Sequence, residues 1–146
     1  MSDGERADWL AAAEAAGVRH LVALLGDEAT AGFQARLAAL HPDLARYITG
    51  FIFGEVRDRP GLDRRTQALC VLAVLAAVGG PPQLAANVRY ALAAGATPAE
   101  IEEVFLLIAP FAGFPAAWNA LAVAREVLGP RDGAGAPDTR EAGDGR

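Results

Sequence analysis

An uninterrupted apolar run at residues 68–78 is the feature that most limits what this chain can fold into. A helix formed from this run is apolar on nearly all sides, so it has to be buried in a core or in an interface. Asp63 stands where it can cap that helix, and the Arg-Pro-Gly sequence at residues 59–61 has the chemistry of a turn. We therefore predict a central helix at residues 64–78, entered through a tight turn that is rich in arginine.

Helix signals recur along the rest of the chain. Thr97 and Glu100 form a capping box around Pro98, which suits the first position of a helix. Gly17 has the position of a helix stop, and no segment shows the sustained alternation of apolar and polar residues that is typical of a half-buried strand. Further helices are predicted at residues 1–16, 18–25, 27–40, 43–56, 83–94, 98–111 and 116–128.

Composition and these helices together predict one all-α domain, folded as a helical bundle. A chain of 146 residues with 53% hydrophobic content can bury a substantial core. We expect an N-terminal helical extension at residues 1–17 and a domain at residues 18–129. A disordered tail is predicted at residues 130–146, because this segment has no large apolar residue.

The charged residues exclude several classes of function. A net charge of -5 at pH 7 argues against general nucleic-acid binding, which needs a basic surface. All 13 basic residues are arginine, and the absence of lysine excludes Schiff-base chemistry and a P-loop. No apolar run reaches the roughly 20 residues of a membrane span, and the N-terminus lacks the layout of a signal peptide. These observations predict a soluble, cytoplasmic protein that binds neither nucleic acid nor a membrane.

The cysteine and the histidines suggest no redox or metal chemistry. Cys70 is the single cysteine, so it cannot form an internal disulfide, and we expect it in the core. His20 and His41 lack the spacing of metal ligands. His20 is expected on the surface, and His41 is expected to start a helix at Pro42.

The predicted helix at residues 43–56 carries a candidate acid. Spacings of three and four place one acidic and several apolar side chains on one face: Leu44, Tyr47, Ile48, Phe51 and Glu55. An apolar helix face raises the pKa of a carboxylic acid, so Glu55 is predicted to act as an acid or base near pH 7. The alternative is that Glu55 forms an ion pair with Arg59 or Arg64 and holds the turn.

Several side chains could bind a small anionic substrate. Arg59, Arg64 and Arg65 can each hold a carboxylate with a bidentate guanidinium, and Arg64 is nearest the buried helix; the alternative for each is surface solvation or a salt bridge between subunits. Asn87 either hydrogen-bonds a ligand or makes an ordinary core hydrogen bond. Aromatic residues that are either core or pocket walls are Tyr47, Phe51, Phe114 and Trp118.

Four segments, in this order, resemble one known family: Gly54-Glu55, then RPGLDRRT at residues 59–66, AAGATPAEI at residues 93–101 and GFPAA at residues 113–117. The chain is similar over about residues 18–128 to the carboxymuconolactone decarboxylase family, which also contains the alkylhydroperoxidase AhpD-like proteins. This resemblance implies a small all-helical subunit with the AhpD-like fold. It also implies assembly into a homo-trimer or homo-hexamer, with sites at or near subunit contacts.

Departures from the family pattern decide which branch the chain is closer to. Glu55 and Cys70 match the glutamate and the second cysteine of the AhpD-like branch, but Gln67 and Val74 stand at its first cysteine and its histidine. Peroxide reduction by that route is excluded because no resolving thiol is present. The chain is closer to the 4-carboxymuconolactone decarboxylase branch, although Asn87 stands where that branch usually has a histidine.

The sequence predicts a cofactor-independent lyase that decarboxylates, or moves a proton within, a small anionic cyclic or polyketide-like carbonyl compound. Such a substrate belongs to aromatic catabolism or to specialised metabolism. The predicted catalytic residues are Glu55 and Arg64, and the predicted substrate-binding residues are Arg59, His41, Tyr47, Phe51, Asn87 and Trp118. The alternatives are an isomerase or cyclase of specialised metabolism on the same fold, or a non-catalytic helical binding or scaffold subunit.

Overall fold

The computed structural model describes residues 1–130, which form helices joined by short connections and contain no strand. The elements are α1 (Asp3–Leu25), α2 (Asp27–Leu40), α3 (Pro42–Arg46), η1 (Tyr47–Val56), α4 (Arg64–Val78), α5 (Pro81–Ala93), α6 (Pro98–Leu107), α7 (Ala109–Ala112) and α8 (Phe114–Leu128). Of these, η1 is a π-helix. The predicted all-α class is confirmed, while all but the first residue of the predicted tail at 130–146 lies outside the described residues.

Local capping chemistry fixes where the helices begin. The Asp63 side chain accepts a hydrogen bond of 3.0 Å from the Thr66 backbone, and α4 starts at the next residue after Asp63, as predicted. Thr97 and Glu100 form both bonds of the expected capping box at the start of α6. At α2, Gly26 is the N-cap residue and Asp27 is the first helical residue, as the predicted range 27–40 has it.

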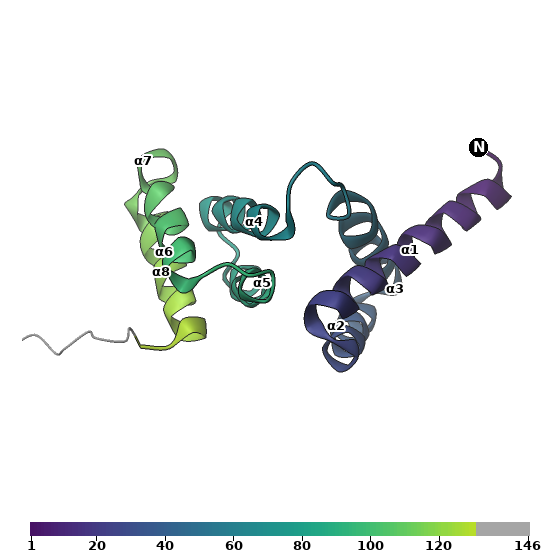
Figure 1. Ribbon diagram of the computed structural model, residues 1–146, viewed down its shortest axis with the longest axis horizontal. Coiled ribbons are helices and arrows are strands. Elements are labelled where there is room, and N and C mark those ends of the chain that lie inside the picture. The colour runs from purple at the N-terminus through teal and green to yellow at the C-terminus, as the bar shows by residue number, and fades with distance from the viewer. Residues whose placement is uncertain (131–146) are drawn as a thin grey trace, which may run out of the picture.

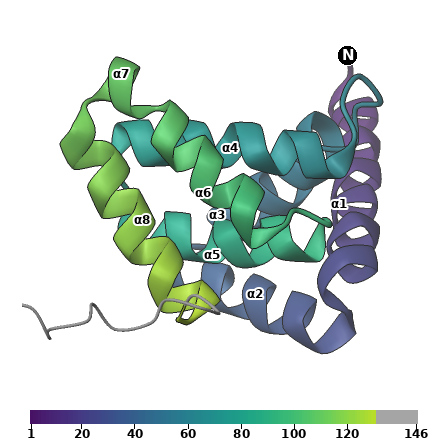
Figure 2. The ribbon, with the colours of Figure 1, turned by 60° about the vertical axis from the view of Figure 1, so that its left-hand side comes forward.

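The helices form two groups that meet along α5. Figure 1 shows α1, α2 and α3 at one end of the ribbon and α6, α7 and α8 at the other, with α4 and α5 between them. The turned view in Figure 2 agrees, with α1 and α8 on opposite sides of α4, α5 and α6. We call α1–η1 the N-terminal helix group and α4–α8 the C-terminal helix group. The largest buried side chains of the core include Leu21, Leu72, Val88, Ile101 and Phe105.

The N-terminal helix does not stop at Gly17, so that prediction is wrong. α1 runs without interruption from Asp3 to Leu25. Gly17 is instead the point where the backbones of α1 and η1 touch, because a Cβ atom there would lie 1.8 Å from the Thr49 carbonyl oxygen. From the other side, a Cβ atom on Gly54 would lie 2.0 Å from the carbonyl oxygen of Ala13. The two glycines allow a close helix contact that no larger residue permits.

This contact also decides which face of η1 is buried, and it is not the predicted one. The buried residues of η1 and of the position that follows it are Thr49, Gly50, Phe53, Gly54 and Arg57. Leu44, Tyr47, Phe51 and Glu55, which were expected on the inner face, are exposed, and Ile48 is partly buried. At Gly50 and Gly54 the backbone of α1 lies so close that it leaves little room for a side chain. Glu55 therefore does not lie on a buried apolar face of the single chain.

Several apolar residues of the C-terminal helix group are exposed as well. Trp118 and Phe114 on α8 are 77% and 80% exposed, and Val74 and Val78 on α4 are also exposed. Cys70, which was expected in the core, is exposed on α4.

Among the helices that the structure describes, none combines the length and the apolar character that a membrane crossing requires.

Candidate active site

A cluster of polar and aromatic side chains lies where α1 and the end of η1 meet α5. His20 on α1, Phe53 on η1, Arg57 just after η1 and Tyr90 on α5 are buried, and Asn87 on α5 is partly buried beside them. We call these five residues the His20–Arg57 cluster. His20 Nε2 lies 2.7 Å from the Tyr90 hydroxyl, and the two rings stack with centroids 6.4 Å apart. The cluster therefore joins the two helix groups.

Arg57 is a buried cation that has no counter-ion among residues 1–130. Its guanidinium carbon lies 4.3 Å from the centroid of the Tyr90 ring and 5.3 Å from that of Phe53, which gives it two cation–π contacts. Nη2 donates a hydrogen bond of 3.1 Å to Asn87 Oδ1, but Nη1 is buried with no hydrogen-bond partner. Within residues 1–130, no ion pair joins Arg57 to a carboxylate. Burying an unpaired charge is unfavourable, so this arrangement favours binding of an anion.

His20 is buried in its neutral form and lies near two arginines, Arg57 and Arg64. Its side chain is only 1% exposed, and Nδ1 lies 3.8 Å from the carboxylate of Asp58 without a hydrogen-bond partner. Burial lowers the pKa of His20, and the positive charges of Arg64 and Arg57 lower it further, while Asp58 opposes them. The imidazole is therefore neutral at pH 7, when it has one N–H donor and one acceptor nitrogen.

The lowered pKa of His20 predicts that the protein loses stability in mild acid. In the unfolded chain the imidazole takes up a proton near its ordinary pKa of 6.5, whereas in the folded protein it does so only at lower pH. Between those two values the unfolded state binds more protons, so the free energy of unfolding decreases as the pH falls. Thermal unfolding is measured at neutral and at mildly acidic pH. The loss of stability between the two is expected to be smaller for His20→Gln than for the wild type. An equal loss in both proteins would contradict this.

Two surface pockets of about 310 Å³ lie away from the cluster. One is lined by α1, α2 and the α3–η1 region and includes the ion pair between Glu14 and Arg46; the other lies between α4, α5 and α8 and includes Gly79 and Asn119. Neither pocket is lined by a residue of the His20–Arg57 cluster, and neither contains a buried charge without a counter-ion. The chemistry therefore favours the cluster as the candidate site.

Two of the residues predicted for the site lie at the cluster. Asn87 accepts the hydrogen bond from Arg57, and its amide nitrogen donates to the Gln83 carbonyl oxygen at 2.9 Å. The side chain thus has a protein partner on each side, as the core alternative for Asn87 requires. Arg64 is exposed at the first residue of α4, yet it is near enough to His20 to affect its pKa.

The other arginines of the turn are exposed. The carbonyl oxygen of Arg59 accepts a hydrogen bond of 3.2 Å from the Gln67 side chain, which also bonds the carbonyl oxygen of Leu62 and so holds the turn. Arg65 forms an ion pair of 3.0 Å with Glu100 and ties α4 to α6. A structural role thus accounts for Arg65. The contact described for Arg59 involves only its backbone, so its side chain is a candidate for substrate binding.

The exposed face of η1 carries the predicted acid and two aromatic residues that were predicted to line the substrate pocket. Tyr47 and Phe51 are 62% and 57% exposed, and Glu55 is exposed on the same helix. Within the described part of the chain, no ion pair links Glu55 to Arg59 or Arg64, so the alternative role of Glu55 in holding the turn is not found.

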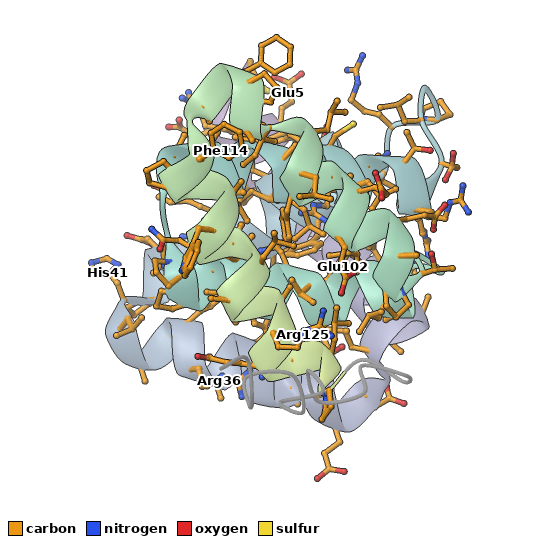
Figure 3. The ribbon with its side chains drawn as sticks, turned by 90° about the vertical axis from the view of Figure 1, so that its left-hand side faces the viewer. Glu5, Arg36, His41, Glu102, Phe114 and Arg125 are labelled. Atoms are coloured by element: carbon orange, nitrogen blue, oxygen red, sulfur yellow. The ribbon has the colours of Figure 1, made fainter. Side chains whose placement is uncertain are left out.

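The remaining predicted residues lie away from the cluster in a single chain. His41 is the N-cap residue of α3, where its Nδ1 accepts a hydrogen bond from the Asp43 backbone. Figure 3 shows His41 projecting outward at the edge of the ribbon and Phe114 on α8 of the C-terminal helix group. Trp118 lies on α8, across the molecule from α1 and α3 in Figure 1.

Sequence reasoning missed four members of the cluster: His20, Phe53, Arg57 and Tyr90. His20 was expected on the surface, but it follows Gly17 by three residues and so shares the buried face of α1. Arg57 follows Phe53 by four residues, which places both on the buried side of η1. These spacings are visible in the sequence, but they become informative only when Gly17 is known to face η1.

Comparisons with known proteins agree with the fold. The sequence profile of the Carboxymuconolactone decarboxylase family matches residues 42–126. A 4-carboxymuconolactone decarboxylase of Acinetobacter baylyi is 38% identical over 86 residues, which are 59% of this chain and 64% of that protein. An uncharacterized 15.0 kDa protein of Paracoccus denitrificans is 40% identical over 82 residues, 55% of this chain and 61% of that protein.

A fungal relative extends this set. The nitrosuccinic acid decarboxylase npaB of Metarhizium robertsii is 32% identical over 81 residues, 56% of this chain and 57% of that protein. The matched part of the chain thus spans less than two thirds of the length of each of these three relatives. α1 and α2, and with them His20, lie outside the residues that the family profile matches.

Proposed function

The chain belongs to the carboxymuconolactone decarboxylase family, and from this premise we propose that it is a cofactor-independent, decarboxylase-like lyase for a small anionic carbonyl compound. The observation that carries the proposal is the environment of Arg57, a cation that is 8% exposed and has a free Nη1 and no carboxylate partner within residues 1–130. A substrate oxygen with negative charge would satisfy both the charge and the free donor.

In the proposed reaction, the bond between the carboxylate carbon and the adjacent carbon breaks and carbon dioxide leaves. The electron pair moves into a neighbouring carbonyl group and forms an enolate. Arg57 stabilises the enolate oxygen, where the charge develops, and thus favours the transition state over the ground state. Arg64 and Arg59, which extend from the turn, orient the leaving carboxylate. Glu55 then donates a proton to the carbon that lost the carboxylate.

The exposed positions of Glu55, Tyr47 and Phe51 fit this proposal if the active form is a homo-trimer or homo-hexamer. A second copy that covers the aromatic face of η1 would remove Glu55 from water and enclose it with the substrate, which protects the proton transfer from solvent. Trp118, 77% exposed on α8, would contribute to such a site from another copy of the chain. Contiguous exposed aromatic residues are typical of protein interfaces.

The proposal is tested by turnover of 4-carboxymuconolactone, followed by ultraviolet absorbance together with carbon dioxide release. The sample assayed is the oligomeric fraction of the protein, separated by size. Glu55→Gln is expected to lower kcat about 100-fold, because loss of a general acid typically costs a factor of 10² to 10⁴. Glu103→Gln, which alters an exposed acid on α6, is the matched control and is expected to keep wild-type turnover. Full activity of Glu55→Gln would show that another group supplies the proton.

An isomerase or cyclase would use the same cluster, because removal of a proton next to a carbonyl gives the same kind of enolate. Substrate consumption without carbon dioxide release would favour that alternative. The non-catalytic scaffold is disfavoured by Arg57, since a buried charge without a counter-ion destabilises a protein that never binds an anion.

A further inference from the structure

We propose that His20 and Arg57 form a two-donor oxyanion site, in which Nδ1–H of His20 and Nη1–H of Arg57 bind the same substrate oxygen. This inference rests on the proposed function and adds to it a residue outside the segment that the family profile matches. It makes α1 a part of the active site and no longer only an N-terminal extension.

The first reason is that both nitrogens are buried donors without a partner. His20 Nδ1 and Arg57 Nη1 each lack a hydrogen bond, although their residues are 2% and 8% exposed. Buried polar atoms in native proteins nearly always have partners, so an unpaired buried donor requires an explanation, and for these two donors we infer a ligand. The two atoms belong to different residues of one cluster, and each is an unpaired buried donor.

The second reason is that the two groups flank the same pair of aromatic rings. The Phe53 ring lies 5.9 Å from the His20 ring and 5.3 Å from the Arg57 guanidinium carbon. The Tyr90 ring lies 6.4 Å from the His20 ring and 4.3 Å from the same guanidinium carbon. The apolar ring surfaces lower the local dielectric constant, so hydrogen bonds to a charged oxygen are stronger here than in water.

The third reason concerns which nitrogen of His20 carries the proton. Tyr90 can donate its hydroxyl hydrogen to Nε2 at 2.7 Å, which leaves the proton of the neutral ring on Nδ1. The carboxylate of Asp58, 3.8 Å from Nδ1, favours the same tautomer electrostatically but is too distant to accept a hydrogen bond. Arg64 and Arg57, the cations near the ring, disfavour a second proton on it. His20 is thus a neutral donor.

Two substitutions of His20 separate this role from a structural one. The amide nitrogen of asparagine can replace the donor at Nδ1 but cannot reach Tyr90, whereas glutamine can reach Tyr90 but has no donor near Nδ1. If His20 binds the oxyanion, His20→Gln is expected to lower kcat about 100-fold, as loss of one oxyanion donor does, and His20→Asn less than tenfold. If the ring only links α1 to Tyr90, the order of the two variants is reversed.

Arg19→Gln is the matched control, since Arg19 is exposed on the same helix, and it is expected to leave turnover unchanged. Equal activity of wild type, His20→Gln and His20→Asn would overturn the inference. Loss of turnover in both variants to the same extent, with unchanged thermal unfolding, would also overturn it, because the Nδ1 donor would then not be the decisive feature.

A binding measurement tests the inference even if 4-carboxymuconolactone is not a substrate. The ring nitrogens of His20 and His41, the two histidines of the chain, are followed by NMR during titration with succinate as a carboxylate probe. A saturable shift of His20 Nδ1 that disappears in Arg57→Met is the expected result. Absence of any shift at His20 would overturn the inference. Failure of turnover combined with this shift would instead reject the proposed reaction and leave the oxyanion site supported.

Discussion

Replacing Gly17 by alanine is expected to destabilise the protein by roughly 2–3 kcal/mol, because the added methyl group has no space. Its Cβ atom would lie 1.8 Å from the Thr49 carbonyl oxygen and 3.1 Å from the Gly54 nitrogen. Both are backbone atoms, so no side chain can rotate away, and α1 would have to move off η1. Denaturant unfolding followed by circular dichroism measures the loss. The effect would oppose the gain of up to about 1 kcal/mol that alanine normally brings to a helix.

Gly32→Ala is the matched control for this prediction. Gly32 lies within α2, where a Cβ atom would meet only the end of the Arg36 side chain at 3.5 Å, an ordinary contact. This variant is expected to be more stable than wild type by about 0.5–1 kcal/mol. If Gly17→Ala were also stabilised, the backbone contact between α1 and η1 would not exist in solution.

Replacing Arg57 by methionine is expected to abolish function while preserving the fold. The variant loses the cation and the free Nη1 donor, and truncating a buried charged partner typically costs 2–5 kcal/mol. A loss of about 4 kcal/mol corresponds to a roughly thousandfold decrease in kcat/KM. Methionine retains contact with the Phe53 and Tyr90 rings and removes a buried charge, so the free energy of unfolding is expected to stay equal or to increase.

Opposite changes in activity and in stability would identify Arg57 as a functional residue. Steady-state kinetics and denaturant unfolding are measured on the same preparation. Arg89→Met is the control, because Arg89 is exposed on α5 between Val88 and Tyr90 and is expected to affect neither quantity strongly. A variant of Arg57 that lost stability and activity together would indicate that the guanidinium mainly holds α5 to η1.

The helix positions were largely predictable because their signals are local. Asp63 caps α4, and Thr97, Pro98 and Glu100 set the start of α6, in each case through atoms within a few residues of one another. Such caps depend on the nearest backbone N–H groups and hardly on the rest of the fold. The apolar run of α4 likewise predicted a helix, although Val74 and Cys70 on it are exposed in the single chain.

The site was mostly not predictable, because it depends on one contact between distant segments. Gly17 looks like a helix stop when only its neighbours are considered, and only its fit against Thr49 shows why it is there. That contact turns Phe53 and Arg57 inward and Glu55 outward. It also buries His20, which carries no local sign of burial. Of the predicted binding residues, Asn87 alone makes a hydrogen bond within the cluster.

α1 supplies a residue to a cluster whose other members come from residues 42–126, the segment that the family profile matches. One side chain of the proposed oxyanion site is therefore encoded outside the segment that defines the family. Relatives that keep the glycine contact and the core residue Leu21 on the first helix could carry another side chain at the position of His20 without rebuilding the core. The first helix is thus a natural place for the chemistry of such proteins to diverge while their common architecture is inherited unchanged.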